Sequence, residues 1–133
     1  MTINFNKAFG IHEQALDVQS RRSAVLANNI ANADTPGFKA RDIDFRQALQ
    51  NAMHANQSSG LARTDSRHFS GNSRYLSTEQ QYRVPMQPDT GDGNTVDANV
   101  EQAAFAQNAI QYQTSLTFLN SKIRGLLTAI RGE

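Results

Sequence analysis

The 133-residue sequence contains no cysteine, and its 13 basic side chains almost balance its 12 acidic ones. The absence of cysteine excludes disulfides and thiol chemistry. A net charge of +1 gives no electrostatic reason to bind nucleic acid or an anionic membrane. No apolar run reaches the ~20 residues of a membrane span, and none resembles the core of a signal peptide. We therefore expect any export to use a route without a cleaved signal.

Apolar residues are also scarce. They make up 38% of the chain, below the ~45–50% usual in globular domains, and the mean hydropathy is −0.57. The length allows one domain. A single compact core is therefore less expected than a shape that buries part of its apolar surface against another chain.

No combination of residues predicts an enzyme, a cofactor site or a metal site. His12 and Glu13 begin like the zinc-protease helix motif, but Leu16 stands where the second histidine is required. Residues 89–94 resemble a calcium loop, but Val100 stands where that loop needs a bidentate acid. We expect no cofactor, no nucleic acid and no small-molecule substrate, with a small enzyme of scattered active site as the remaining alternative.

A proline and a glycine end the first helical pattern of the chain. Apolar residues at spacings of three and four predict a helix from about Ile11 to Ala33. Pro36 lacks a backbone donor and favours extended geometry at Thr35, and the following Gly37 is typical of a tight turn with a positive φ. The chain must therefore start in a new direction after residue 37.

Three asparagines crowd the end of this first helix. Asn28, Asn29 and Asn32 can each donate and accept hydrogen bonds. We expect them to fix the end of the helix against the C-terminal helix or against a neighbouring subunit. The block from residue 27 to residue 40 is thus predicted to be an assembly joint.

The C-terminal segment, residues 96–133, carries the clearest helical pattern. Asn94 is the expected N-cap, and Gly132 ends the helix. Its apolar residues repeat at spacings of four and three, as in a heptad seam: Phe105, Ala109, Tyr112, Leu116, Leu119, Ile123, Leu126 and Ile130. Such a helix is ~50 Å long at 1.5 Å per residue. We predict an all-α, elongated antiparallel hairpin or coiled coil of the two terminal helices, with part of the seam left for another chain.

The intervening segment, residues 34–95, is polar and rich in turn-forming residues. A short helix is predicted from about residue 44 to residue 57, capped by Asp42 or Asp44. Residues 58–95 are expected to be ordered only on assembly, apart from a short extended piece at residues 82–86. Within them, aromatic residues are candidate anchors for a partner: Phe69, Tyr75 and Tyr82.

The joint block carries a family resemblance. Leu26-Ala27-Asn28-Asn29-Ile30-Ala31-Asn32, followed by Thr35-Pro36-Gly37-Phe38-Lys39-Ala40, resembles the N-terminal signature of the bacterial flagellar rod and hook family. That signature is a helix ending in LANNIAN, then TPGF or TPGY and a basic residue. The resemblance implies a structural subunit of the flagellar basal body, without enzymatic activity, that polymerises into the rod and transmits torque.

The chain length narrows the choice within the family. The 133 residues leave no room for the large inserted domain of hook and distal-rod proteins, so a proximal rod subunit is expected, linking the base of the motor to the distal rod and hook. The runs Asp42–Phe45 and Gly93–Asp97 favour a member other than proximal rod protein C. Protein C remains an alternative, as does a coiled-coil adaptor or needle-like subunit of another secretion system.

The resemblance also implies partners, a location and an interface. The expected partners are other copies of the chain, proximal rod proteins C and F, distal rod protein G, basal-body protein E and the flagellar export gate. The expected location is the periplasm-spanning rod, reached by flagellar type III export. We hypothesise that the terminal helices are poorly ordered in the exported monomer and order on assembly. The expected interface residues are Leu26, Asn28, Asn29, Ile30, Asn32, Thr35, Pro36, Gly37, Phe38, Phe105, Tyr112, Leu116, Leu119, Ile123, Leu126 and Ile130.

Overall fold

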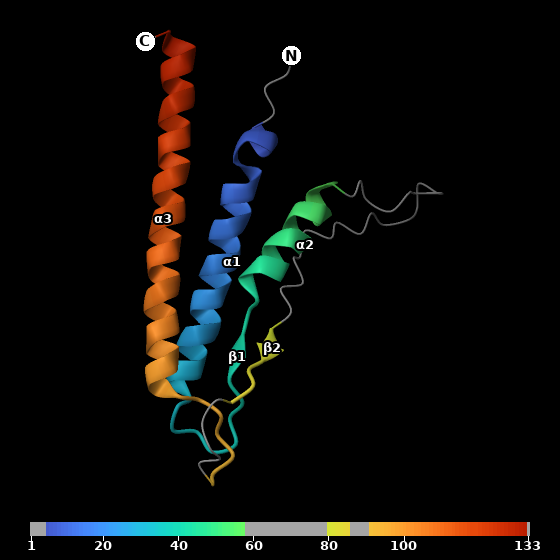
Figure 1. Cartoon of the computed structure of the whole chain (residues 1–133), viewed down its shortest axis with the longest axis vertical. Coiled ribbons are helices and arrows are strands. Elements are labelled where there is room, and N and C mark those ends of the chain that lie inside the picture. The colour runs from blue at the N-terminus through green and yellow to red at the C-terminus, as the bar shows by residue number, and fades with distance from the viewer. Residues whose placement is uncertain (1–4, 58–79, 86–90, 133) are drawn as a thin grey trace, which may run out of the picture.

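The computed structural model describes residues 5–57, 80–85 and 91–132. The described elements, in chain order, are α1 (Phe5–Ala31), β1 (Arg41–Asp42), α2 (Phe45–Gln57), β2 (Gln81–Tyr82) and α3 (Ala98–Arg131). The long helices α1 and α3 run antiparallel, side by side, and α2 lies against α1 on the side away from α3 (Figure 1). The predicted all-α, elongated hairpin is confirmed. The antiparallel pair of two-residue strands was not predicted.

The helix boundaries differ slightly from the prediction. Helix α1 starts at Phe5 rather than near Ile11, and it ends at Ala31 rather than Ala33. Helix α2 starts at Phe45 because the Asp44 carboxylate accepts hydrogen bonds from the backbone N–H groups of residues 46 and 47, at 2.9 and 3.1 Å. Asp44 is therefore the cap, and Asp42 is free for another role.

The N-cap of α3 is Asp97, and the prediction of Asn94 for this role is wrong. The Asp97 carboxylate accepts hydrogen bonds from the N–H groups of Asn99 and Val100, at 3.0 and 3.3 Å. Gly132 ends the helix, as predicted. Its φ is 74°, and its N–H donates to the Thr128 carbonyl at 3.0 Å.

The apolar core is small and joins α1 to α2 and β1. Its buried members are Val18, Val25, Ile43 and Ala48, with Phe45 packed against them. Burying a large aliphatic side chain contributes about 1.5–3 kcal/mol. This cluster therefore holds α2 and the segment after β1 against α1. It leaves α3 to be held by other contacts.

The middle segment is described only in part. A short extended piece is present, as predicted, but it lies at Gln81–Tyr82. Met86, Phe69 and Tyr75, which the prediction also used, lie outside the described residues. Tyr82 is exposed, and the Arg41 guanidinium lies 5.0 Å from its ring centroid.

Candidate functional site

The bend of the hairpin is built from two loops that lie side by side at one end of the molecule (Figure 1). The Phe38 N–H donates to the Thr35 carbonyl at 3.2 Å and closes the turn at Pro36. Gly37 has the predicted positive φ, 71°. Its N–H donates to the Asp92 carbonyl at 2.9 Å, so the predicted turn also docks the loop that leads into α3.

Asn94 caps the C-terminal end of α1 from across the bend. Its side-chain N–H groups donate to the carbonyls of Asn32, Ala33 and Thr35, at 3.1, 2.7 and 3.0 Å. Its carbonyl Oδ1 accepts from the Val96 N–H at 2.8 Å. These orphan carbonyls are what the end of any helix must satisfy. Asn94 therefore ties the end of α1 to the approach of α3.

The three asparagines of the joint block have different roles. Asn29 is buried, and its side chain donates to Glu101 Oε2 at 3.0 Å and to the Arg41 carbonyl at 2.6 Å. Asn29 thus contacts the C-terminal helix. Asn32 donates to the carbonyl and the side chain of Asn28 within the last turn of α1. Contact of Asn28 and Asn32 with a neighbouring subunit stays a prediction.

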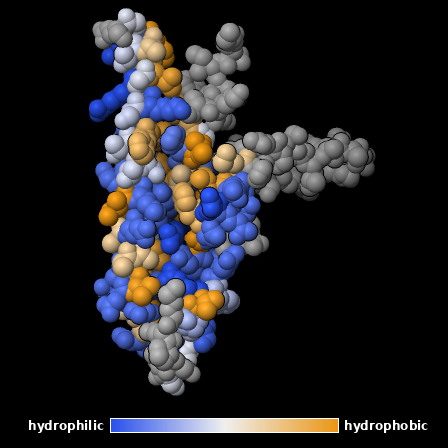
Figure 2. Space-filling view, viewed as in Figure 1, coloured by the Kyte–Doolittle hydropathy of each residue, from blue (hydrophilic) through white to orange (hydrophobic). Residues whose placement is uncertain are grey.

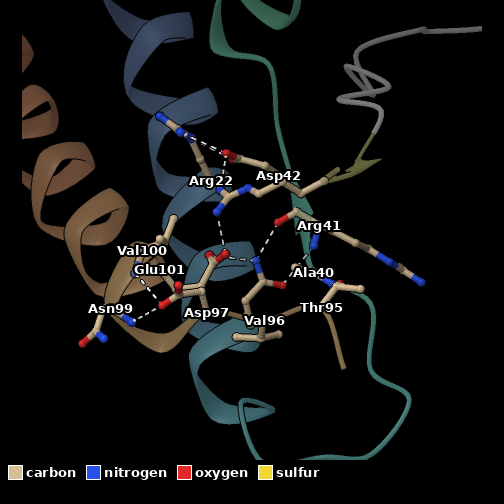
Figure 3. Close-up of polar contacts among 12 residues, drawn as sticks. Arg22, Ala40, Arg41, Asp42, Thr95, Val96, Asp97, Asn99, Val100 and Glu101 are labelled. Atoms are coloured by element: carbon tan, nitrogen blue, oxygen red, sulfur yellow. Dashed lines mark hydrogen bonds and ion pairs between the residues drawn. The ribbon is translucent and has the colours of Figure 1, made fainter. Parts of the chain in front are cut away.

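A network of ion pairs joins four elements beside Asn29. Arg22 of α1 donates two hydrogen bonds to the Asp42 carboxylate of β1, at 2.9 and 3.0 Å. Arg83, next to β2, donates to the same carboxylate at 2.6 Å and to Glu101 of α3 at 2.5 Å. Figure 3 shows Arg22 and Asp42 close to the labelled Glu101. We call the set Arg22, Asn29, Asp42, Arg83 and Glu101 the polar clamp.

The pKa values of Asp42 and Arg22 are both shifted in favour of the charged forms. Burial raises the pKa of Asp42, but hydrogen bonds from Arg22, Arg83 and the Ile43 N–H outweigh it and hold that pKa below its usual value. The hydrogen bond to Asp42 raises the pKa of Arg22. Two arginines thus neutralise two carboxylates, and removing one partner would leave a buried charge uncompensated, at about 3 kcal/mol.

The sequence did not reveal the polar clamp. Arg22 and Arg83 were not among the predicted interface residues. Asp42 lies 20 residues from Arg22 and 41 from Arg83. No local spacing rule links partners so far apart, so only the hairpin geometry brings them together.

The predicted heptad seam is only partly covered by α1. Tyr112, Leu116, Leu119 and Leu126 are half-buried. Three large residues of the seam remain open to solvent, at 38%, 37% and 71% exposure: Phe105, Ile123 and Ile130. Apolar side chains accordingly reach the surface along α3 (Figure 2). The exposed residues of the seam, with the neighbouring Leu127, form what we call the apolar stripe.

The apolar surface of α3 is wider than the seam. Val100, Ile110 and Phe118 are also exposed and were not predicted to be interface residues. In the joint block, Leu26 is fully buried, Ile30 and Phe38 are half-buried, and the turn residues 35–37 are exposed. The interface role of all these residues stays a prediction.

The described residues offer little for small ligands. Within 5–57, 80–85 and 91–132, no group of three or more His, Cys, Asp or Glu side chains lies together as a metal site would require. No helix in these same ranges is long and apolar enough to cross a membrane.

A helical hairpin with a clamped bend and an exposed apolar stripe defines a class of protein, the structural subunit that packs against other chains. Comparison with known proteins specifies the family. Residues 9–39, which include most of α1 and the turn, match the family model described as flagella basal body rod protein. The chain belongs to the FlgB family of flagellar basal body rod proteins.

Full-length relatives support this assignment. The chain is 59% identical over 133 residues to the flagellar basal body rod protein FlgB of Aeromonas hydrophila, covering 100% of the chain and 99% of the relative. Identity to FlgB of Escherichia coli K12 is 40% over 136 residues, covering 98% of each. A FlgB of Cereibacter sphaeroides is 46% identical over 129 residues, covering 97% of the chain and 98% of the relative. The predicted flagellar rod family is confirmed, and FlgB rather than protein C is the matching member.

Proposed function

We propose that this structural subunit of the flagellar basal body rod lies in the proximal rod and transmits torque from the base of the motor to the distal rod and hook. Family membership supports a rod position. Near-complete coverage of the FlgB relatives supports the proximal one, because the shared length holds no large inserted domain. The proposed location is the periplasm-spanning part of the basal body, reached by flagellar type III export.

The proposed partners are proteins of the same assembly. They comprise other copies of the chain, proximal rod proteins C and F, distal rod protein G, basal-body protein E and the flagellar export gate. The family resemblance supports this set. The physical basis for binding is the apolar stripe of α3, because an exposed helix face of this kind is stabilised when a second helix covers it.

Assembly would bury the apolar stripe. Each fully buried aliphatic side chain contributes about 1.5–3 kcal/mol, less the cost of ordering the partners. A stripe that meets a different surface on the neighbour makes a heterologous contact, which builds a helical filament rather than a closed dimer. The polar clamp would meanwhile hold the bend of each subunit in one geometry, as torque transmission requires.

The observation that carries this proposal is the exposure of Ile123 and Ile130 on a helix of a rod-family protein. Its test is Ile123→Asp, with Asn120→Asp as the matched control on the same exposed surface. The first substitution should abolish swimming and remove the chain from purified basal bodies, because a buried carboxylate would be left unpaired. The control should swim normally.

Circular dichroism of the purified variants completes this test. Ile123 is at the surface of the isolated chain, so its replacement should leave the helical signal unchanged. Leu119→Asp should also block assembly, but Leu119 is half-buried and its replacement can disturb the hairpin itself. Normal rods in the Ile123→Asp strain would contradict the proposed interface.

A further inference from the structure

The face that α3 turns toward α1 is polar over its first three turns. Its two buried residues are Glu101 and Asn108, which lie one heptad apart and therefore on one face of the helix. Ser115, seven residues further on, is half-buried. We call Glu101, Asn108 and Ser115 the polar column.

Asn108 makes the second polar contact between the long helices, after Glu101. It is fully buried. Its side-chain N–H groups donate to the Gln19 carbonyl at 2.8 Å and to the Ser23 hydroxyl at 2.7 Å. Two contacts one heptad apart, at Glu101 and at Asn108, fix how α3 is rotated about its own axis.

This rotation is not the one that would bury the most apolar surface within the chain. Successive residues of a helix are separated by about 100°. From Asn108, Leu119 is therefore turned by about 20°, Tyr112 by about 40°, Ile123 by about 60° and Leu116 by about 80°. The centre of these four seam residues thus lies about 50° away from the line through Asn108, and a roll of α3 by that angle would turn it toward α1.

The observed rotation also leaves polar atoms unsatisfied. Asn108 Oδ1 and Gln19 Oε1 are buried and have no hydrogen-bond partner among the described residues. An unpaired buried acceptor lowers stability. A buried asparagine in a helix interface is a known means of specifying one arrangement at the expense of stability.

We propose that Asn108, together with Glu101, holds α3 in a rotation that keeps the apolar stripe outside the hairpin and available to neighbouring subunits. Asn108 is a positioning residue, since it acts through the orientation of α3. The significance of the stripe as an interface rests on the proposed function. The rotation of α3 is a property of the single chain and can be measured without assembly.

The test uses single cysteines, which report uniquely because the native chain has none. Ile123→Cys places a thiol on the apolar stripe, and Ser115→Cys places one on the polar column. Each cysteine variant is combined with Asn108→Leu. The control combines each cysteine variant with Asn120→Leu, which introduces the same side chain at an exposed position of α3. The rate of reaction with a small maleimide is measured on the purified full-length chain.

In the Asn108→Leu background, α3 rolls to bury the seam. The thiol at position 123 then reacts several-fold more slowly and that at position 115 several-fold faster than in the parent chain. The midpoint of denaturant unfolding rises. Asn120→Leu changes neither labelling rate.

Opposite changes at the two positions distinguish a roll from loss of structure, because an unfolded chain would label faster at both. Faster labelling at both positions, unchanged rates, or a lower unfolding midpoint would each overturn the proposal. If the opposite changes occur but the Asn108→Leu chain still builds normal rods, the role of Asn108 in the rotation of α3 is supported. The proposal that the apolar stripe is the assembly interface is then contradicted. The two ideas therefore fail separately.

Discussion

At the scale of single residues, one asparagine amide determines how the hairpin turns. Asn94 donates to carbonyls at the end of α1 and accepts from the chain that enters α3. It is 6% exposed, so water cannot easily replace it. The main-chain bonds between Gly37 and Asp92 and between Phe38 and Thr95 then continue the same contact. These hydrogen bonds therefore hold the two loops of the bend together.

Replacement of Asn94 by alanine should weaken the bend. The change removes one donor from each of the carbonyls of Asn32, Ala33 and Thr35, and the Ala33 carbonyl keeps no backbone donor in its place, at a cost of about 1–3 kcal/mol in the free energy of unfolding. Urea unfolding followed by circular dichroism measures this loss. Asn99→Ala, at an exposed position of α3, is the control and should change stability by about 0.5 kcal/mol or less. Equal stability of the two variants would contradict the role of Asn94.

At the scale of elements, the two-residue strands are important because they position charged side chains between the helices. Asp42 of β1 accepts from Arg22 of α1 and from Arg83 beside β2, and Arg83 reaches Glu101 of α3. A pair of strands this short contributes little by its own ladder. Its value is to place one carboxylate and one guanidinium between the helices.

The stability of the polar clamp should depend on pH. The pKa of Asp42 is lower in the folded chain than the ~3.9 of an unfolded one. Its ionised form therefore contributes stability above about pH 4, and this contribution is lost as the pH falls through the folded pKa. Asp42→Asn should be less stable at pH 7 and should lose less stability between pH 5 and pH 2.5. Thermal unfolding across that range tests this, and parallel curves for the two chains would contradict it.

Local signals predicted the helices and their ends, and long-range contacts escaped prediction. The positive φ of Gly37 and the capping by Asp44 follow from a few adjacent residues. Glu101 was not among the predicted interface residues, because its burial against Asn29 depends on a partner 72 residues away. The apolar repeat of α3 predicted a seam, which α1 covers in part. The polar column that also faces α1 escaped prediction, because hydropathy alone does not weigh buried hydrogen bonds.

At the scale of the whole molecule, the two ends of the hairpin differ. The bend is closed by the polar clamp and by Asn94. Helix α3 has 34 residues and α1 has 27. The difference in length is about 10 Å at 1.5 Å per residue. Ile130, near the tip of α3, is 71% exposed. Among the described residues, the molecule thus combines a fixed bend with an apolar end of α3 that is open to solvent.

The most direct test is whether this open end is covered in the rod. Ile130→Cys supplies a single thiol, and its reaction with maleimide is compared between the purified chain and purified basal bodies, with denatured basal bodies giving the total. The thiol should react readily in the free chain and be protected in the basal body, because a neighbouring subunit packs on the apolar stripe there. Equal reactivity in the free and the assembled chain would contradict the claim that the stripe is the assembly interface.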